Sequence, residues 1–524
     1  MKGSVPKQSP WQLTAEEIAG VVGGALVSGE RGERFGPVSI DTRTLAAGDL
    51  FFAIRGERFD GHDFVAGALD GGARGVVVSD RRAVPTSAAA VVIIVQDTVG
   101  ALQALAHHVR AGSGARVIAI TGSTGKTSTK EIVAAILAAR YRVVRNQGNW
   151  NNHIGLPLSL LALLARPELA VVELGMNHVG EIARLVAIAE PDVRVWTNVG
   201  DAHVGLLGSV ERVADAKAEI MEGATSDSLL IANADDTYVM SRARRFPGQV
   251  VTFGIHAPAD VKACDVRVRG LSGVEATITT SEASLPLRVP LLGPGQFANV
   301  LAAVTVALQF QIPLHTIAAE VSALKPFVHR GEVFSLRNGI VVVDDSYNSS
   351  PSALTVALEI LTAEKADGRR VAVLGEMREL GSRGREIHRH SGLMAAKCGL
   401  DLLVSVGGPD ARALADGAID GGLDPAQVHH VGHAAHRVGP ATETEQIDPV
   451  ARLIRLDDRF IAIGDVVADA GPERRSEDTR NLLQPIRAGL PGAQTSVVER
   501  DLLSRVYVGV DARARCTIQL VNVG

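Results

Sequence analysis

The chain has 524 residues, of which 46% are hydrophobic and 4% are aromatic, so its cores are built mainly from aliphatic side chains. Its 53 basic and 58 acidic residues give a formal net charge of −5, and the sequence has no long basic stripe of the kind that binds a phosphate backbone. The length and composition predict about three α/β domains and argue against nucleic acid as a partner.

The distribution of cysteines and of apolar residues favours a reducing compartment and argues against a membrane protein. Cys264, Cys398 and Cys516 are far apart in the sequence, which argues against a disulfide framework and against a CxxC metal site. The N-terminal segment has no apolar core typical of a signal peptide, and no apolar run approaches the roughly 18 residues that span a bilayer. The longest such run, 156–165, contains Pro157 and predicts a buried helix. We therefore expect a cytoplasmic, monomeric protein without membrane insertion.

The first predicted domain, residues 1–112, opens with a helix. Thr14 and Glu17 have the spacing of a capping box, in which each side chain accepts a hydrogen bond from the other residue's backbone. Apolar runs then alternate with helical patterns, with strands expected at 50–54, 75–78 and 91–95 and helices near 64–69 and 99–109. The small residues at 111–115 predict a flexible linker to the next domain.

The second predicted domain, residues 113–325, begins with the run RVIAITGSTGKTSTK at 116–130. This run joins a buried-strand signal to a glycine-rich turn and a helix start, a pattern typical of nucleotide phosphate sites. An ordinary strand-turn-helix connection is the alternative interpretation. The apolar residues that recur at helical spacing over 132–137 favour the nucleotide site.

Each residue type in this turn suits a phosphate group. Gly122 and Gly125 let the backbone turn tightly, and the first amides of the following helix point at an anion. Lys126 would neutralise a terminal phosphate, and the Thr127 hydroxyl would hold magnesium. The position six before Lys126 is Ile120 rather than glycine, so the loop is shorter than the usual Walker pattern. We assign the phosphate contacts to Gly122, Ser123, Thr124, Gly125, Lys126 and Thr127.

Polar residues follow later strands of this domain. Strands expected at 170–173, 193–197 and 228–232 alternate with helices, which predicts a parallel sheet covered on both faces. Glu173 ends the first of these strands and His203 follows the second, at the sheet edge where open α/β sheets bind ligands. A carboxylate there would bind magnesium, whereas a solvated strand end and a satisfied polar histidine are the alternatives.

The third predicted domain, residues 326–465, has the alternation typical of a Rossmann-like α/β fold. Its strands are expected at 340–344, 371–374 and 402–406, separated by helical runs. Asp344 and Asp345 end the first of these strands, which suggests a functional site, although a helix-capping turn is an alternative.

Ordered motifs between about residue 11 and about residue 410 carry a resemblance. The segments GDLFFAIRGERFDGHDF, TGSTGKTSTKE, GNWNNHIGLPLSLL, VELGMNHVGEI, TNVGDAHVGLLGS, ADAKAEI, HRGEV, DDSYNSSP and GEMRELG are similar to those of the Mur ligases. Within that family, FDGHDF, DSYN and GEMRELG resemble the member that joins D-alanyl-D-alanine to UDP-N-acetylmuramoyl-tripeptide. The resemblance implies a cytoplasmic ligase of peptidoglycan synthesis that uses ATP and Mg²⁺, activates a carboxylate as an acyl phosphate and releases ADP. It also implies a central P-loop ATPase domain between a small α/β UDP-binding domain and a C-terminal Rossmann-like domain.

The resemblance assigns chemistry to Lys217 that its surroundings in the sequence do not. Its apolar helical segment alone predicts a surface lysine with its stem on apolar surface. An ammonium with a pKa of about 10.4 cannot bind magnesium, so the resemblance implies a carbamate at Lys217, which presents two anionic oxygens. The implied metal ligands are Thr127, Glu173, His203 and carbamylated Lys217, and the implied catalytic residues are Lys126, His203, Lys217 and Arg330.

The remaining site residues also follow from the resemblance. The UDP moiety would face Thr42 and Arg43, and the muramoyl peptide would lie nearer Asn151 and Asn152. The nucleotide would further contact Asn299, Arg330, Asp345 and Asn348.

Two departures from the family pattern leave alternatives open. Gly295 and Gln296 stand where the family has His-Asn, so only Asn299 of that motif matches. After 464–467 the family's lysine-glycine-serine-arginine turn is absent, and residues 466–524 are expected to form an atypical tail, disordered or altered in reading frame. The alternatives are a catalytically impaired homologue that binds precursor and nucleotide, or a sister ligase that adds a single amino acid.

A histidine cluster lies between the third domain's motifs and this tail. The spacing of His429, His430, His433 and His436 could place several imidazoles on one helical face, as a metal site requires. Gly432 within the cluster favours a solvated or disordered stretch instead.

Overall fold

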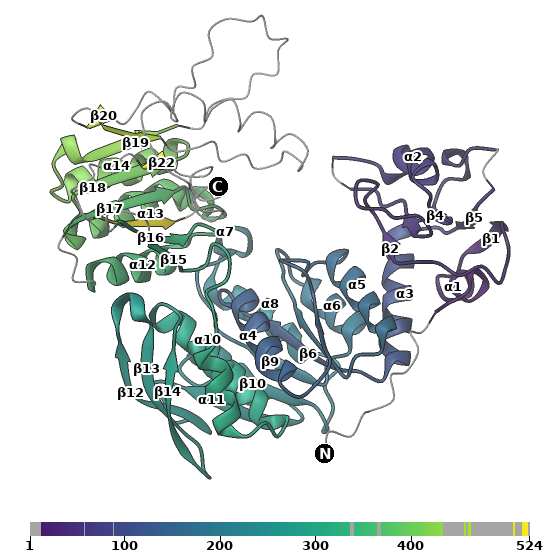
Figure 1. The fold of residues 1–524 in the computed structure, drawn as a ribbon, viewed down its shortest axis with the longest axis horizontal. Helices are drawn as coiled ribbons and strands as arrows, with labels where there is room; N and C mark the ends of the chain where they lie inside the picture. Colours follow the sequence, from purple (N-terminus) through teal and green to yellow (C-terminus); the bar gives the residue numbers. More distant parts are fainter. Residues whose placement is uncertain are drawn as a thin grey trace, which may run out of the picture. The chain divides into compact units, whose positions relative to one another are not determined.

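The computed structural model describes residues 12–56, 58–86, 89–335, 340–363, 368–432, 455–456, 459–462, 507–508 and 516–521. The chain forms two compact units, whose course is shown in Figure 1. The first comprises Met1–Arg267, Glu275–Val289 and Gly295–Leu324, and the second comprises Val268–Val274, Pro290–Pro294 and Lys325–Gly524.

The first unit opens with a small α/β layer. It contains helices α1 (Ala15–Val21) and α2 (Val65–Asp70) and strands β1 (Ala25–Ser28), β2 (Val38–Ser39), β3 (Leu50–Phe52), β4 (Gly75–Val78) and β5 (Val91–Ile94). In the described part of the chain these strands form a five-stranded sheet in the order β1-β5-β4-β3-β2, parallel except for the β1 and β5 pair. The capping box of Thr14 and Glu17 is present at the start of α1, as predicted.

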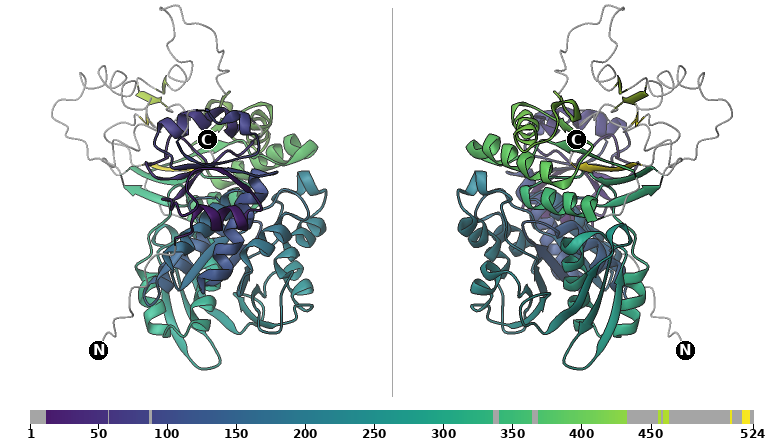
Figure 2. Two further views of the ribbon diagram at one scale, coloured as in Figure 1. Left: turned by 90° about the vertical axis from the view of Figure 1, so that its right-hand side faces the viewer. Right: turned by 90° about the vertical axis from the view of Figure 1, so that its left-hand side faces the viewer.

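Helices cover both faces of this sheet because side chains alternate along its strands. Phe52 belongs to the same apolar cluster as Ile18 of α1, whereas Phe51 and Val76 belong to a second cluster with Val65 of α2. Figure 2 shows the two helices on opposite sides of the strands. The predicted strands at 50–54, 75–78 and 91–95 are confirmed, whereas β1 and β2 were not predicted.

Helix α3 (Thr98–Ser113) connects this layer to the central sheet. It packs on helices of the central sheet, and Arg110 donates from Nη2 to Glu190 O at 2.7 Å. The predicted flexible linker at 111–115 is wrong for its first three residues, which complete the last turn of α3. Gly114, with a φ of 72°, ends the helix in a left-handed conformation, so only a sharp turn separates α3 from the next strand.

The central sheet carries the glycine-rich turn. Its strands are β6 (Arg116–Thr121), β7 (Val143–Arg145), β8 (Leu169–Glu173), β9 (Val193–Trp196), β10 (Leu229–Asn233), β11 (Gln249–Gly254), β12 (Val261–Val268), β13 (Val274–Thr279) and β14 (Ser284–Val289). Its helices are α4 (Lys126–Ala138), α5 (Gly155–Leu160), α6 (Glu181–Ala189), α7 (Val204–Leu207), α8 (Val210–Ala218), α9 (Thr237–Ala243), α10 (Gly293–Gln309) and α11 (Leu314–Ser322).

The order of this sheet, over the residues described, is β14-β13-β12-β11-β10-β9-β6-β8-β7. The strands from β7 to β12 pair in parallel, as predicted for the central domain. The buried helix predicted at 156–165 is present as α5 followed by a 3₁₀ turn at Leu161–Ala165. Because β8, β6 and β9 are adjacent and parallel, their carboxyl ends share one edge of the sheet.

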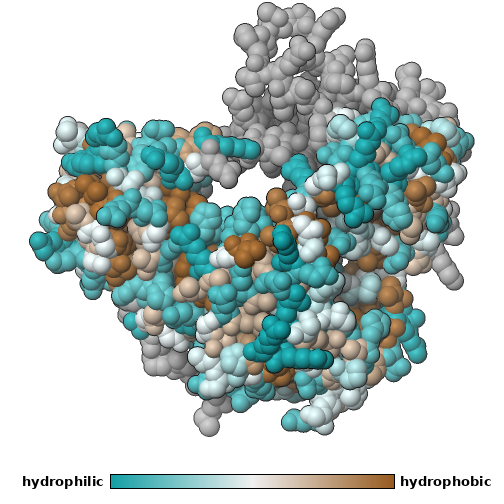
Figure 3. Space-filling model, turned by 180° about the vertical axis from the view of Figure 1, so that it is seen from behind, coloured by the Kyte–Doolittle hydropathy of each residue, from teal (hydrophilic) through white to brown (hydrophobic). Residues whose placement is uncertain are grey.

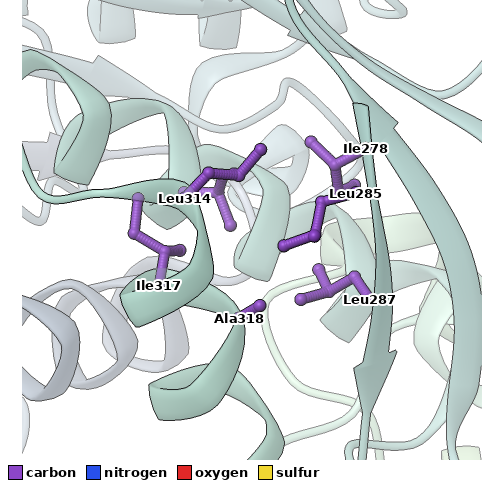
Figure 4. Close-up of a pocket in the computed structure, with 7 residues that line it drawn as sticks. Ile278, Leu285, Leu287, Leu314, Ile317 and Ala318 are labelled. Carbon is purple, nitrogen blue, oxygen red and sulfur yellow. The ribbon is translucent and has the colours of Figure 1, made fainter. Parts of the chain in front are cut away.

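At the other end of the sheet, β13 and β14 pack on α10 and α11. Aliphatic side chains from these elements line a small pocket (Figure 4), namely Ile278, Leu285, Leu287, Val304, Leu314, Ile317 and Ala318. No polar side chain is among these described lining residues, so the pocket is a packing gap of the core rather than a site for a polar ligand.

The second unit is a separate α/β layer. Its strands include β15 (Glu332–Ser335), β16 (Ile340–Asp345), β17 (Arg369–Gly375), β18 (Leu402–Val406), β19 (Val428–Val431) and β23 (Cys516–Val521), and its helices include α12 (Pro351–Ala363), α13 (Gly384–Ala395) and α14 (Pro409–Asp420). The main sheet of the described residues has the order β15-β16-β23-β17-β18-β19 and is parallel except for β15. Short strands β20 (Arg455–Leu456), β21 (Arg459–Ala462) and β22 (Tyr507–Val508) form a further sheet.

Strand β23 corrects the prediction of a tail outside the third domain. It lies between β16 and β17, with Ile518 opposite Val342 on one side and opposite Val371 on the other. Residues near the end of the chain therefore supply an interior strand of this sheet. A third domain that ended at residue 465 would omit this strand. Apart from β22 and β23, the predicted tail 466–524 lies outside the described residues.

The histidine cluster does not form the helical face considered from its spacing. His429 and His430 lie on strand β19, where successive side chains point to opposite faces of the sheet. His430 Nδ1 is 2.8 Å from Ser405 Oγ of β18. His433 and His436 lie outside the described residues.

Apolar residues are scattered over the molecular face in Figure 3, in small patches among polar ones. Among the helices of the described residues, none is both long enough and apolar enough to cross a membrane.

Candidate functional site

The glycine-rich turn joins β6 to α4 through positions that exclude a side chain. Gly125 precedes α4 with a φ of 80°, a left-handed conformation that other residues rarely adopt. A Cβ on Gly125 would collide with Asn299 Oδ1, and a Cβ on Gly122 would collide with Thr197 Oγ1. Asn299 of α10 therefore lies against the loop, where its side chain also donates to Gln296 Oε1 at 3.2 Å.

Thr197, Asn198 and Gly200, which follow β9, hold the loop in shape. The Ser123 amide donates to Asn198 O and the Thr124 amide to Asn198 Oδ1, both at 3.0 Å. Thr197 Oγ1 donates to Thr124 O at 2.9 Å, and the Gly200 amide donates to Ser123 Oγ at 2.8 Å. Ser123 and Thr124 thus use their amides within the protein rather than for a phosphate. Sequence reasoning missed Thr197 and Asn198, whose signal is a polar pair directly after a buried strand.

Two lysines lie beside this loop. Lys126 begins α4, and its Nζ donates to Gly122 O at 2.9 Å. Lys217, on α8, is 1% exposed, so the prediction of a surface lysine is wrong. Burial lowers the pKa of Lys217 well below its usual value, and the charge of Lys126 lowers this pKa further. Lys217 is thus one of the buried residues of α8, together with Val213, Ala214 and Ala216.

Glu173 has the surroundings of a metal ligand rather than of a solvated strand end. It is 1% exposed, and its Oε1 accepts a hydrogen bond from Asn151 Nδ2 at 2.5 Å. No described residue donates a hydrogen bond to its buried Oε2. A buried polar atom without a partner is unfavourable by about 1–3 kcal/mol, and more when it is charged. Carboxylate oxygens are ligands that Mg²⁺ prefers, so Glu173 fits the predicted cation.

His203 follows β9 at the same sheet edge as Glu173. It precedes α7 with a φ of 67°, a left-handed conformation that is uncommon outside glycine and is found at functional sites. The described residues contain no preformed group of three or more His, Cys, Asp or Glu side chains arranged for a metal. Magnesium at this edge would therefore also need oxygens from Thr127, from a modified Lys217 or from phosphate.

The predicted substrate residues have different surroundings. Asn152 Oδ1 accepts a hydrogen bond from the Gly155 amide at the start of α5 at 2.8 Å, whereas Asn151 contacts Glu173. On the first sheet, exposed Arg43 pairs with Asp41 at 2.7 Å, and its hydrogen bond lowers the pKa of Asp41. Thr42 beside it is partly buried.

Arg330, Asp345 and Asn348 lie in the second unit. The Arg330 guanidinium lies 3.9 Å from the ring centroid of Tyr347. Burial raises the pKa of Asp345 to about 6, and the charge of Arg330 opposes this rise. Asn348 is exposed. A half-buried carboxyl group with a raised pKa beside an arginine is typical of a functional site.

Asp344 differs from its neighbour because its oxygens are used within the fold. Its Oδ2 is 2.7 Å from His329 Nδ1, and its Oδ1 accepts a hydrogen bond from the Ser346 amide at 3.0 Å. The alternative that the paired acids cap α12 is wrong, because Ser350 Oγ accepts the Ala353 amide there at 3.3 Å.

Comparisons with known proteins show which family the chain resembles in sequence. Residues 34–110 match the family described as "Mur ligase family, catalytic domain", residues 120–307 match "Mur ligase middle domain", and residues 329–446 match "Mur ligase, glutamate ligase domain". The UDP-N-acetylmuramoyl-tripeptide–D-alanyl-D-alanine ligase of Bacillus subtilis is 36% identical over 407 residues, which cover 78% of this chain and 87% of that relative. The chain belongs to the Mur ligase family.

Solved structures of Mur ligases share the fold. MurF from Acinetobacter baumannii is 25% identical with a TM-score of 0.73, over 99% of this chain and 96% of that one. MurF ligase from Thermotoga maritima, solved in complex with ADP, is 28% identical with a TM-score of 0.65, over 76% of this chain and 93% of that one. Family membership confirms the predicted α/β fold and an ATP-dependent, ADP-forming ligase.

Proposed function

We propose that this Mur ligase joins D-alanyl-D-alanine to UDP-N-acetylmuramoyl-tripeptide, a cytoplasmic step of peptidoglycan precursor synthesis. The proposal rests on one observation: the chain is 36% identical in sequence, over most of both chains, to a relative named for this reaction. The buried Glu173 and Lys217 beside a glycine-rich loop support a reaction driven by ATP.

The reaction has two chemical steps. An oxygen of the tripeptide carboxylate attacks the γ-phosphorus of ATP, the bond to the bridging oxygen breaks, and ADP leaves an acyl phosphate behind. The free amine of D-alanyl-D-alanine then attacks the acyl carbon, and the tetrahedral intermediate expels phosphate as the nitrogen loses a proton. The protein's task is therefore to align the reactants and to neutralise charge.

Each group at the edge of the central sheet has a part in this task. Lys126 and the amides at the start of α4 would neutralise and orient the phosphates. Magnesium, held by Thr127, Glu173, His203 and carbamylated Lys217, would supply positive charge to the phosphate oxygens.

The chemistry of Lys217 supports carbamylation. A lowered pKa favours the neutral amine, which is the form that attacks the carbon of CO₂. The new bond joins nitrogen to carbon, the nitrogen loses a proton, and the product carries one negative charge shared by two oxygens. The positive charge of Lys126, which disfavours an ammonium at Lys217, would favour this anion.

The other predicted residues complete the proposal. In the segment 1–112, Thr42 and Arg43 would face the UDP moiety, and Asn151 and Asn152 of the segment 113–325 would face the muramoyl peptide. The nucleotide contacts would be Asn299 together with Arg330, Asp345 and Asn348 of the segment that begins at 326.

Phosphate release from ATP tests the proposal. We expect release only when both the UDP-muramoyl-tripeptide and D-alanyl-D-alanine are present, with formation of the amide product by mass spectrometry. Release with a free diamino acid and the shorter UDP-precursor would instead indicate the sister ligase. Binding of ATP and precursor without release would indicate the catalytically impaired homologue.

A further inference from the structure

A fully buried lysine anchors the loop next to the candidate metal carboxylate. Lys130 of α4 is 0% exposed, and its Nζ donates to Asn146 O at 2.8 Å and to Gly148 O at 2.9 Å. Glu131 Oε1 lies 3.1 Å from the same ammonium. A charged group is strongly unfavourable in the interior unless it is paired and hydrogen-bonded, so these three oxygens explain how Lys130 is tolerated.

The loop that Lys130 anchors holds Glu173 in turn. Asn146 Oδ1 accepts a hydrogen bond from the Glu173 amide at 3.1 Å, and Asn146 Nδ2 donates to Trp150 O at 3.2 Å. Asn151 Nδ2 donates to Glu173 Oε1 at 2.5 Å, and the Gly175 amide donates to Asn151 O at 2.9 Å. Backbone and side chain of Glu173 are thus both fixed by this loop, which leaves Oε2 for another partner.

Close packing allows a change at Lys130 to reach Glu173. A Cβ on Gly175 would lie 2.6 Å from Asn151 Oδ1, and a Cβ on Gly155 would lie 2.7 Å from Trp150 Cα. The loop is therefore packed tightly where it follows Lys130's two carbonyl partners. Displacement of the Asn146 end should move Asn151 and with it the carboxylate.

We infer that Lys130 is a positioning residue for the metal: by fixing the carbonyls of Asn146 and Gly148, it aims Glu173 Oε2 at the cation. This inference rests on the magnesium site of the proposed function. If Lys130 served stability alone, its removal would lower the melting temperature of the protein and leave the metal affinity of the folded protein unchanged.

Manganese provides a direct measurement of metal affinity, because Mn²⁺ takes the same octahedral oxygen sites as Mg²⁺. The full chain, saturated with a non-hydrolysable ATP analogue, is titrated with Mn²⁺, and free Mn²⁺ is followed by electron paramagnetic resonance. Groups that orient metal ligands typically change metal affinity 10–100-fold, so Lys130→Met should raise the Kd for Mn²⁺ by about tenfold or more.

The chain offers a matched control. Lys262 of β12 also donates to two backbone carbonyls, His256 O at 2.6 Å and Ala257 O at 2.7 Å. Three strands, β11, β10 and β9, separate β12 from β6 in the sheet. Lys262→Met should therefore lose similar hydrogen bonds while keeping the wild-type Kd for Mn²⁺. Asn146→Ala removes the next link and should raise the Kd in the same direction, which decides the matter if Lys130→Met does not fold.

The outcomes separate the inference from the function on which it rests. A wild-type Kd in folded Lys130→Met, or in Asn146→Ala when only that variant folds, overturns the positioning role and leaves the magnesium site standing. Equal weakening in Lys262→Met also overturns it, because the effect would then be general. Absence of Mn²⁺ binding by the wild-type complex overturns the magnesium site and the inference together.

Discussion

The charge of Lys126 acts on the buried amine of Lys217 and helps to keep that amine neutral. The two lysines thus have complementary states beside one loop. The charge of Lys126 would suit a phosphate, whereas the lowered pKa of Lys217 favours the neutral amine that can react with CO₂. A carbamate at Lys217, as proposed above, would turn the repulsion between the two side chains into attraction.

Replacing Lys217 by methionine should remove turnover with little effect on precursor binding. The variant keeps the length of the side chain and fills the same buried space, but it cannot form a carbamate. We expect a fall in kcat of about 100-fold or more, which corresponds to roughly 3 kcal/mol of lost transition-state stabilisation. The Kd for UDP-muramoyl-tripeptide, measured by calorimetry, should match that of the Lys262→Met control. A kcat near the wild-type value would contradict the assigned role.

The same substitution should change how stability depends on pH. The folded-state pKa of Lys217 lies below its unfolded value, so between the two the unfolded chain binds a proton that the folded chain lacks. Wild-type stability should therefore rise with pH up to about 10.4, and this rise should be smaller in Lys217→Met. Urea unfolding in metal-free, CO₂-free buffer at several pH values measures the difference. Parallel curves for the two proteins would show that Lys217 is not perturbed.

Asp345 gives a pH dependence of the opposite sign. Its folded-state pKa of about 6 is above the unfolded value of 3.8, so the folded protein retains a proton between these values. Its stability contribution is complete below the unfolded pKa and is lost as pH rises through about 6, by up to about 3 kcal/mol. Hydrogen exchange of β16 and β17 peptides should thus accelerate from pH 4 to pH 7, after correction for the intrinsic rate. Asp345→Asn should remove this part of the acceleration. If the variant kept the wild-type pH dependence of exchange, the effect would not come from Asp345.

Features of the candidate site could be predicted from the sequence where their signal is local. The glycine-rich turn and Glu173 at a strand end are visible because a strand, a turn and a polar residue follow one another along the chain. The burial of Lys217 was not visible without the family resemblance, since tertiary packing decides which face of α8 meets the core. Thr197 and Asn198 were missed for the same reason, because their partners lie more than seventy positions away.

The fold, like the site, was predictable where the signal is local and not where distant segments pair. The strands at 50–54, 75–78 and 91–95 were predicted from continuous apolar runs, which buried parallel strands share. The place of β23 was not predicted, because a short run such as 516–521 carries no mark of the strands beside which it inserts. Pairing across more than 140 positions is set by the whole sheet rather than by local pattern.

Gly125→Ala should weaken ATP binding by distorting only the glycine-rich loop. Its φ of 80° and the contact with Asn299 both oppose a side chain, at a cost of about 1–3 kcal/mol in local strain. We expect a higher Kd for ATP by calorimetry and an unchanged Kd for UDP-muramoyl-tripeptide. Adding Asn299→Ala should relieve the collision but not the backbone strain. Gly67→Ala, at an exposed position of α2 where a Cβ meets nothing within 4 Å, is the control and should leave both constants unchanged.

Ile518→Pro tests whether the last described strand completes the second unit. Ile518 lies in register with Val342 of β16 and Val371 of β17, so proline would remove a ladder hydrogen bond inside the sheet. We expect a loss of about 3 kcal/mol or more, seen as faster hydrogen exchange in β16 and β17 peptides while β6 and β8 peptides keep their protection.

Ile518→Val retains the backbone amide and is the matched control for this strand. It should preserve protection in both β16 and β17, because the ladder is intact. Asp345 ends β16, so a loosened sheet in Ile518→Pro should also abolish ligation, whereas ATP should still protect the loop between β6 and α4 from exchange. If β16 and β17 kept wild-type protection in the proline variant, β23 would not lie in the interior of the sheet. The third domain, which lacks the lysine-glycine-serine-arginine turn, would then be incomplete.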